Sequence, residues 1–135
     1  MPIATIHVPE SLLTEENSKA IATGACEIFA EALGAPLDRV RCFVNSYSDS
    51  GVFCGGAVVS DGGDPAPFYT FYVLADRTAE LVTAMHEAFA ALLAEKLNVD
   101  KSTIRGACQR ITPEDWAIGG VPAAIARKAE LDARK

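Results

Sequence analysis

The chain has 135 residues, of which 50% are hydrophobic and 22% are charged, and its formal net charge is -6. This length suits one domain or two small repeated units with a real hydrophobic core, and the negative charge disfavours nucleic acid as a partner. No apolar run approaches the roughly 20 residues of a membrane span, no signal peptide is visible, and four cysteines without a C-x-x-C pair indicate reduced thiols in a cytoplasmic protein.

The amino terminus carries the first candidate functional group. Pro2 follows Met1 directly. If Met1 is removed, the Pro2 nitrogen becomes a terminal secondary amine, which can act as a base without a metal or cofactor. Burial and nearby cations lower the pKa of such an amine from the roughly 8 of an ordinary α-amino group. A neutral amine at working pH is an effective general base, although Pro2 is also a common second residue.

The first half of the chain predicts a strand, a helix and a second strand. Residues 2–8 are apolar and rich in β-branched side chains, which is typical of a buried strand. Thr14, followed by two acidic residues, is a candidate N-cap, and Gly34 is a candidate helix end. A second strand is expected at about 39–47. The helix between the caps carries an apolar stripe at helical spacing: Ile21, Ala25, Ile28, Phe29 and Leu33.

The second half predicts the same order of elements. Residues 67–74 form an apolar and aromatic strand, Thr78 is the candidate N-cap, Asn98 the candidate helix end, and 103–111 the second strand. The corresponding helical stripe consists of Leu81, Met85, Phe89, Leu92 and Leu93, with Leu97 following.

The two halves are therefore repeats. Pro, Thr and Val recur at an offset of 65, and three later landmarks recur at an offset of 64. The matched pairs are Pro2/Pro67, Thr5/Thr70, Val8/Val73, Thr14/Thr78, Arg41/Arg105 and Gly55-Gly56/Gly119-Gly120.

This repetition predicts one α+β domain. We expect two tandem β-α-β units, about 2–58 and 67–122, joined by a turn-rich linker at about 60–66. Each unit makes a parallel strand pair with a right-handed crossover. Together they form a four-stranded sheet with both helices on one face, and oligomerisation would cover the other face. Residues 123–135 are expected to form a short helix or a frayed tail without a motif.

Neither histidine predicts a metal site. His7 lies in a predicted strand and His86 on a predicted helix, and neither has a partner at metal-ligand spacing. We expect no metal and no cofactor. Gly119-Gly120 indicates a turn rather than a phosphate cradle, because no G-K-[ST] follows.

Three stretches together resemble the tautomerase superfamily, which has an amino-terminal proline. They are Pro2-Ile-Ala-Thr-Ile-His7, Ala35-Pro36-Leu37 before Val40-Arg41, and 111–120, which reads ITPEDWAIGG. The resemblance is to 4-oxalocrotonate tautomerase, and in particular to the fused type with two units in one chain. It implies a tautomerase/MIF-like fold, a homotrimer, and a small carboxylate as substrate.

The resemblance also implies which residues act. Pro2 is the catalytic base, whereas Pro67 has an amide nitrogen and cannot be one. The family's first arginine is kept as Arg77, where the first unit has Leu13. Its second arginine is kept in both units, and its aromatic wall is Trp116, where the first unit has Val52. Because the roles divide between units, we expect Arg77, Arg105 and Trp116 at the Pro2 site, and Arg41 mainly near Pro67.

The predicted activity is cofactor-independent keto-enol tautomerisation of a small 2-oxo or 2-hydroxydienoic acid. Arginine suits this chemistry, because its planar fork binds carboxylates and can stabilise an enolate. Asp38 resembles the catalytic acid of malonate semialdehyde decarboxylases, so a decarboxylase is an alternative. A dehalogenase or hydratase is a further one, although Ile118 stands where some of these enzymes have a water-activating glutamate. A catalytically inactive trimeric binding protein is the alternative from another class.

Overall fold

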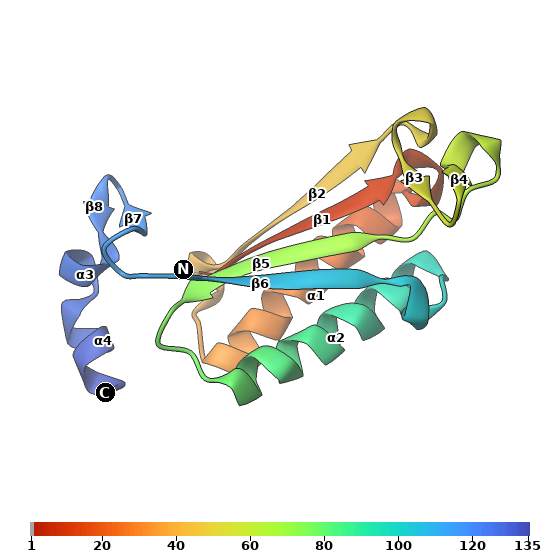
Figure 1. The fold of residues 1–135 in the computed structure, drawn as a ribbon. Coiled ribbons are helices and arrows are strands. Elements are labelled where there is room, and N and C mark those ends of the chain that lie inside the picture. Colours follow the sequence, from red (N-terminus) through yellow and green to blue (C-terminus); the bar gives the residue numbers. More distant parts are fainter. Residues whose placement is uncertain (1) are drawn as a thin grey trace.

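A computed structural model describes residues 2–135 (Figure 1). Met1, on whose removal the Pro2 amine depends, lies outside the described residues. The first unit consists of β1 (Ile3–Pro9), α1 (Glu15–Leu33) and β2 (Arg41–Tyr47), followed by a hairpin of β3 (Phe53–Cys54) and β4 (Ala57–Val58). The second unit consists of β5 (Phe68–Leu74), α2 (Ala79–Leu97) and β6 (Arg105–Ile111), followed by a hairpin of β7 (Ala117–Ile118) and β8 (Val121–Pro122). The chain continues with α3 (Ala123–Ala126) and α4 (Lys128–Ala133).

The predicted sheet and its helical layer are confirmed. The strand order is β2-β1-β5-β6. Each unit contributes a parallel pair, β1 with β2 and β5 with β6, and the two units meet through the antiparallel pair β1 and β5. Both long helices cover the same face of the sheet (Figure 1). The matched threonines of the repeat, Thr5 and Thr70, face each other across the central pair and their hydroxyls are hydrogen-bonded.

The helix boundaries follow the predicted caps. The Thr14 hydroxyl accepts from the Asn17 amide at 3.0 Å, and the Asn17 side chain accepts from the Thr14 amide at 2.8 Å, which is a capping box. The Thr78 hydroxyl accepts from the amide at the third helical position of α2. Gly34 and Asn98 both adopt left-handed backbone conformations, with φ of 64° and 52°, as helix-ending residues do.

Each second strand begins slightly later than predicted. The residues just before β2 and β6 form short 3-10 turns, Leu37–Arg39 and Lys101–Thr103. Backbone donors in these turns are satisfied locally, since Arg39 donates to the Pro36 carbonyl at 2.9 Å. The strand ladder therefore starts only at the two matched arginines, Arg41 and Arg105.

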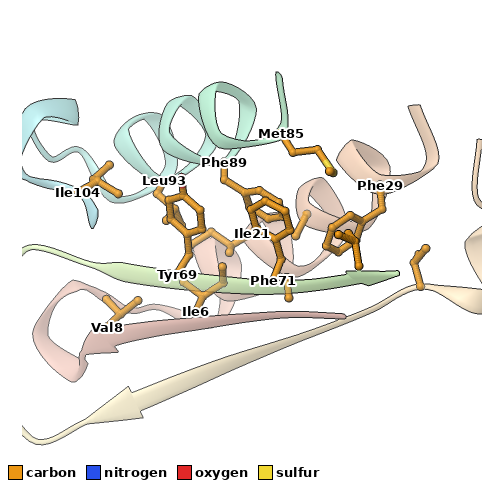
Figure 2. Close-up of a cluster of buried hydrophobic side chains, with 14 of the residues drawn as sticks. Ile6, Val8, Ile21, Phe29, Tyr69, Phe71, Met85, Phe89, Leu93 and Ile104 are labelled. Atoms are coloured by element: carbon orange, nitrogen blue, oxygen red, sulfur yellow. The ribbon is translucent and has the colours of Figure 1, made fainter. Parts of the chain in front are cut away.

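The hydrophobic core lies between the sheet and the helices (Figure 2). Ile6 of β1 and Phe71 of β5 point toward Phe29 and Phe89 of the two helices, and all four are fully buried. The rings of Phe29 and Phe89 meet edge to face with centroids 5.4 Å apart, a favoured geometry. In α2 the buried stripe contains Val82 rather than the predicted Leu81.

The opposite face of the sheet is uncovered within one chain. Strand side chains alternate between the two faces, so positions flanking the buried ones point away from the helices. Phe43, Tyr47 and Phe68 lie on this side and are 53%, 40% and 42% exposed. A half-apolar sheet face of this kind needs a covering layer.

One close approach between strands gives a test of the packing. Gly106 of β6 pairs with Tyr69 of β5, and a methyl group at Gly106 would lie 2.0–2.4 Å from ring carbons of Tyr69. The ring cannot swing away freely, because the Tyr69 hydroxyl is hydrogen-bonded with His86 Nδ1 at 2.7 Å. We expect Gly106→Ala to lower the free energy of unfolding by about 1–3 kcal/mol, as overpacking does, measured by urea unfolding at fixed protein concentration.

Gly51→Ala is the matched control. No atom lies within 4 Å of the added methyl group, and the backbone there is not left-handed. Its unfolding midpoint should stay close to that of the parent chain. Equal midpoints for the two variants would contradict this account of the β5–β6 contact.

Candidate active site around Pro2

Pro2 is buried at the end of the sheet where β1 begins and β5 ends, here called the Pro2 edge, and it lines a pocket. The central strands are antiparallel, with Ile3 opposite Tyr72, so the start of β1 lies beside the end of β5. The pocket walls accordingly come from the turn after α1 (residues 33–36) and from residues 73–74 at the end of β5. This is also the edge at which the C-terminal segment lies (Figure 1).

Four of the chain's seven arginines gather around Pro2. Arg39 comes from the turn before β2 and Arg77 from the turn after β5, whereas Arg127 and Arg134 come from the C-terminal segment. This concentration of positive charge occurs in a chain whose net charge is -6. A cleft lined with one sign of charge attracts ligands of the opposite sign, so the pocket suits an anion.

Two of these arginines are held by carboxylates. Arg39 Nη1 donates to both carboxylate oxygens of Glu130 at 2.9 and 3.1 Å, and this hydrogen bond is the main cause that lowers the pKa of Glu130. Arg134 donates to both oxygens of Asp76 at 2.6 and 3.3 Å. Burial alone would raise the pKa of Asp76, but the hydrogen bond and the charge of Arg134 outweigh burial and lower it.

Among the described residues, the other two arginines have no hydrogen bond or close ion pair with a carboxylate, although Arg77 interacts with the charge of Asp76 and Arg127 with that of Glu130. Burial lowers the pKa of Arg77, and the charge of Arg134 lowers it further, against the opposing effect of Asp76; a guanidinium still stays protonated in a protein. Arg127 Nη1 donates to the Ala126 carbonyl at 3.4 Å, while its Nε is buried without a hydrogen-bond partner. These two guanidiniums therefore keep hydrogen-bonding capacity for a ligand.

A second pocket adjoins the first. Arg39 and Arg127 line both pockets. The second pocket contains three residues that the sequence predicts for the site: Asp38, Arg41 and Trp116. Asp38 is exposed and does not line the Pro2 pocket.

Within one chain, Arg41 rather than Arg105 lies beside Pro2, whereas the sequence predicts Arg105 at the Pro2 site and Arg41 mainly near Pro67. The Arg41 amide donates to the Pro2 carbonyl at 3.3 Å, and the Arg105 amide donates to the Pro67 carbonyl at the same distance. The reason is topological: the strands of a β-α-β unit are parallel, so each second strand starts beside its own unit's proline. Arg105 therefore lies at the edge of the sheet opposite to Pro2.

The ends of the second unit do reach the Pro2 edge. Arg77 follows β5, and Trp116 follows β6, whose last residue pairs with the last residue of β5. The Trp116 ring lies 6.3 Å from the Tyr72 ring, centroid to centroid. Within one chain, Arg77 thus lines the Pro2 pocket and Trp116 the pocket that adjoins it.

Sequence reasoning missed the contribution of the C-terminal segment. Arg127, Glu130 and Arg134 all line the Pro2 pocket, although this stretch was expected to carry no motif. A signal was present, because these positions are three and seven residues apart, which places them on one face of a helix. What the spacing does not reveal is which surface that face meets.

Other kinds of site find no support in the part of the chain that the structure describes. Within residues 2–135, no group of three or more His, Cys, Asp or Glu side chains is arranged to hold a metal ion. None of the described helices is both long and apolar enough to cross a membrane. Cys42 is half-buried, and desolvation is the main cause that raises its pKa to about 12, with a smaller effect of Cys26, so it is not a reactive thiolate.

Solved structures similar to this chain include fused 4-oxalocrotonate tautomerases (4-OT). Native fused 4-OT is 23% identical, with a TM-score of 0.85, and the match covers 93% of this chain and 99% of that one. Pt0534 inactivated by 2-oxo-3-pentynoate is 20% identical, with a TM-score of 0.84 and coverage of 92% and 98%. A fused 4-OT symmetric trimer, Q0, is 22% identical, with a TM-score of 0.82 and coverage of 92% and 98%.

Matches at the level of sequence are absent. No protein-family model matches the chain, and no curated protein matches it. The structural similarity nevertheless extends over almost the whole length of both chains. The chain therefore has the fold of the fused 4-OT tautomerases.

Proposed function

We propose that this protein is a cofactor-independent tautomerase of the 4-OT type, acting on a small 2-oxo or 2-hydroxydienoic acid. The observation that carries the proposal is the burial of Pro2 in a pocket lined by four arginines. After removal of Met1, the Pro2 nitrogen is a secondary amine, and the surrounding positive charges disfavour its protonated form. The neutral amine then takes a proton from one carbon or oxygen of the substrate and returns it at another.

Arginine supplies the remaining chemistry. The Arg77 guanidinium lines the Pro2 pocket and has no hydrogen-bonded carboxylate, although the charge of Asp76 acts on it. It is therefore available to bind a substrate carboxylate or to stabilise the enolate that forms during proton transfer. Arg41 and Trp116 border the adjoining pocket, where they extend the surface for a longer substrate. Arg105 contributes to a Pro2 site only if a neighbouring copy presents it.

A decarboxylase is the second candidate. The observation that favours it is that Asp38 lies in the pocket adjoining the Pro2 pocket, together with Arg41 and Trp116. It ranks second because Asp38 is exposed and does not line the Pro2 pocket itself. Hydration chemistry has less support, because Ile118, which also borders this pocket, stands at the position where some of these enzymes have a water-activating glutamate.

The first test concerns the amine. Pro2→Ala replaces the secondary amine of the processed chain by a primary one, and we expect the rate of phenylenolpyruvate tautomerisation to fall by about 100- to 10,000-fold, the usual contribution of general-base catalysis. Intact mass gives the state of Met1 in the same sample. Treatment with 2-oxo-3-pentynoate, the compound that inactivated Pt0534, should add its mass to the amino-terminal peptide.

Pro36→Ala is the control, because Pro36 lines the same pocket but its nitrogen is an amide. Its tautomerisation rate should stay near that of the parent. If Met1 is absent and Pro2→Ala keeps the full rate, Pro2 is not the base. If the parent, with Met1 removed, shows no turnover at all and no labelling, the inactive binding protein becomes the better description.

The second test concerns the arginines. A charge-assisted contact is worth about 1.5–3 kcal/mol, or about 10- to 150-fold. We expect Arg77→Ala to lower kcat/KM by this factor, and Lys101→Ala, an exposed cation at the opposite edge, to leave it unchanged. A full rate for Arg77→Ala would remove this residue from the site.

Arg105 allows a sharper version of this experiment. If Arg105→Ala also lowers kcat/KM, the arginine must act from another chain, since it lies at the far edge of its own. Mixed oligomers of Pro2→Ala and Arg105→Ala chains should then recover part of the activity. Mixed oligomers of Pro2→Ala and Arg77→Ala chains should recover more only if Arg77 also serves a neighbour, which the shared pocket argues against.

The third test concerns assembly, for which we propose a homotrimer. Three copies would cover the open sheet face that carries Phe43 and Phe68, and fused 4-OT neighbours are described as trimers. Phe43→Glu places a charge on this face and should shift the mass measured by light scattering toward the monomer. Ala91→Glu, on the exposed side of α2, should leave the mass unchanged. A parent chain that is monomeric at micromolar concentration would contradict the trimer.

A further inference from the structure

Arg127 lies where the C-terminal segment changes direction. It is the residue between α3 and α4, with φ of -124° and ψ of 26°. Its amide donates to the Ala123 carbonyl at 2.8 Å, and Ala123 is itself fully buried and donates to the Trp116 carbonyl at 2.7 Å. The backbone of Arg127 is thereby tied to the stretch around Trp116, just before β7.

Two ion pairs hold the segment on the side that follows Arg127. Glu130 binds Arg39 of the first unit, and Arg134 binds Asp76 of the second unit, in each case through two contacts. The segment therefore spans both units across the mouth of the pocket that Pro2 lines. Because Arg39 and Arg134 are already paired with carboxylates, neither guanidinium is fully available to bind a ligand.

Arg127 differs from these two arginines in having no hydrogen-bonded carboxylate: its charge helps to lower the pKa of Glu130, but the Glu130 carboxylate is hydrogen-bonded to Arg39. The described residues offer its guanidinium only the Ala126 carbonyl, and its Nε is buried without any partner. A buried donor that loses water without gaining an acceptor is unfavourable, and it is more so for a charged group. A ligand that brings an anionic acceptor would relieve this cost. Arg127 also lines both the Pro2 pocket and the adjoining pocket, so such a ligand can reach it from Pro2.

We propose that Arg127 of the C-terminal segment binds the carboxylate of the substrate in the Pro2 pocket, and that the Arg39–Glu130 and Arg134–Asp76 pairs position it there. This inference rests on the proposed function, because it needs a small anionic substrate beside Pro2. Arg77 and Arg127 then supply two free guanidiniums to one pocket, one from the body of the chain and one from its C-terminal segment.

The test compares Arg127→Gln with Lys128→Gln. Both remove one positive charge from adjacent residues, but the Lys128 side chain is 73% exposed, pairs with Asp132 and does not line the pocket. The probe is phenylpyruvate, a stable 2-oxo acid, titrated calorimetrically into the full chain. We expect Arg127→Gln to raise its Kd by about 10- to 150-fold, Lys128→Gln to leave it unchanged, and Arg127→Lys to fall between. The KM for phenylenolpyruvate should rise in parallel, with a smaller change in kcat.

The outcomes separate this inference from the function on which it rests. If Arg127→Gln binds phenylpyruvate like the parent while Pro2→Ala abolishes turnover, the role of Arg127 is overturned and the tautomerase proposal stands. If the parent neither turns over phenylenolpyruvate nor binds phenylpyruvate, the proposed function fails first. If Arg127→Gln dissociates the oligomer at concentrations where Lys128→Gln does not, Arg127 serves a contact between copies, and the inference is overturned.

Discussion

The antiparallel pairing of β1 with β5 is the constraint on which the rest of the structure depends. Each β-α-β unit is parallel inside, so its two strands start at one edge of the sheet and end at the other. Joining the units head to tail across Thr5 and Thr70 places the start of one unit beside the end of the other. The turn after β5 and the C-terminal segment after β6 therefore lie at the edge where the chain begins.

Because of this pairing, the two ends of the sheet have the same arrangement of strands, but different side chains line the pockets there. At the Pro2 edge the pocket is lined by arginines. At the opposite edge, near the start of β5, a pocket is lined mainly by apolar side chains, with His7 Nδ1 hydrogen-bonded to the Tyr47 hydroxyl at 2.6 Å, and no arginine lines it. Pro67 at that edge has an amide nitrogen and cannot act as a base. Only the Pro2 edge combines a potential terminal amine with free cations.

Two kinds of contact hold the C-terminal segment: hydrogen bonds to the stretch just before it, and ion pairs to both units. Ion pairs between partly exposed side chains contribute only about 0–1 kcal/mol each, and the side chains of Arg39 and Glu130 are 33% and 45% exposed. The buried Ala123 and the hydrogen bond from Ala124 to the Pro113 carbonyl, at 3.0 Å, tie the start of the segment to the loop between β6 and β7. The ion pairs then select the orientation in which Arg127 faces the pocket.

Local signals in the sequence were sufficient for the fold. The offsets of 65 and 64 between matched residues, the caps at Thr14 and Thr78, and the apolar stripes specify two strand-helix-strand units. These features depend on contacts between residues near in sequence or on a face of one element, which is why periodicity and capping chemistry reveal them. Pro2, Arg77 and Trp116 could also be named, because the resemblance to the tautomerase superfamily points to these residue types and the repeat shows which unit keeps each of them.

Which residues meet at Pro2 was decided only by the tertiary structure. Whether Arg41 or Arg105 lies beside Pro2 depends on the direction in which the two units pair, and strand pairing between units leaves no trace in the spacing of residues. The same holds for Arg127, Glu130 and Arg134: their spacing indicates a common helical face, but not the surface that it contacts. Charge pairing across 91 residues, as between Arg39 and Glu130, arises only when the folded chain brings both ends of the sequence to one edge of the sheet.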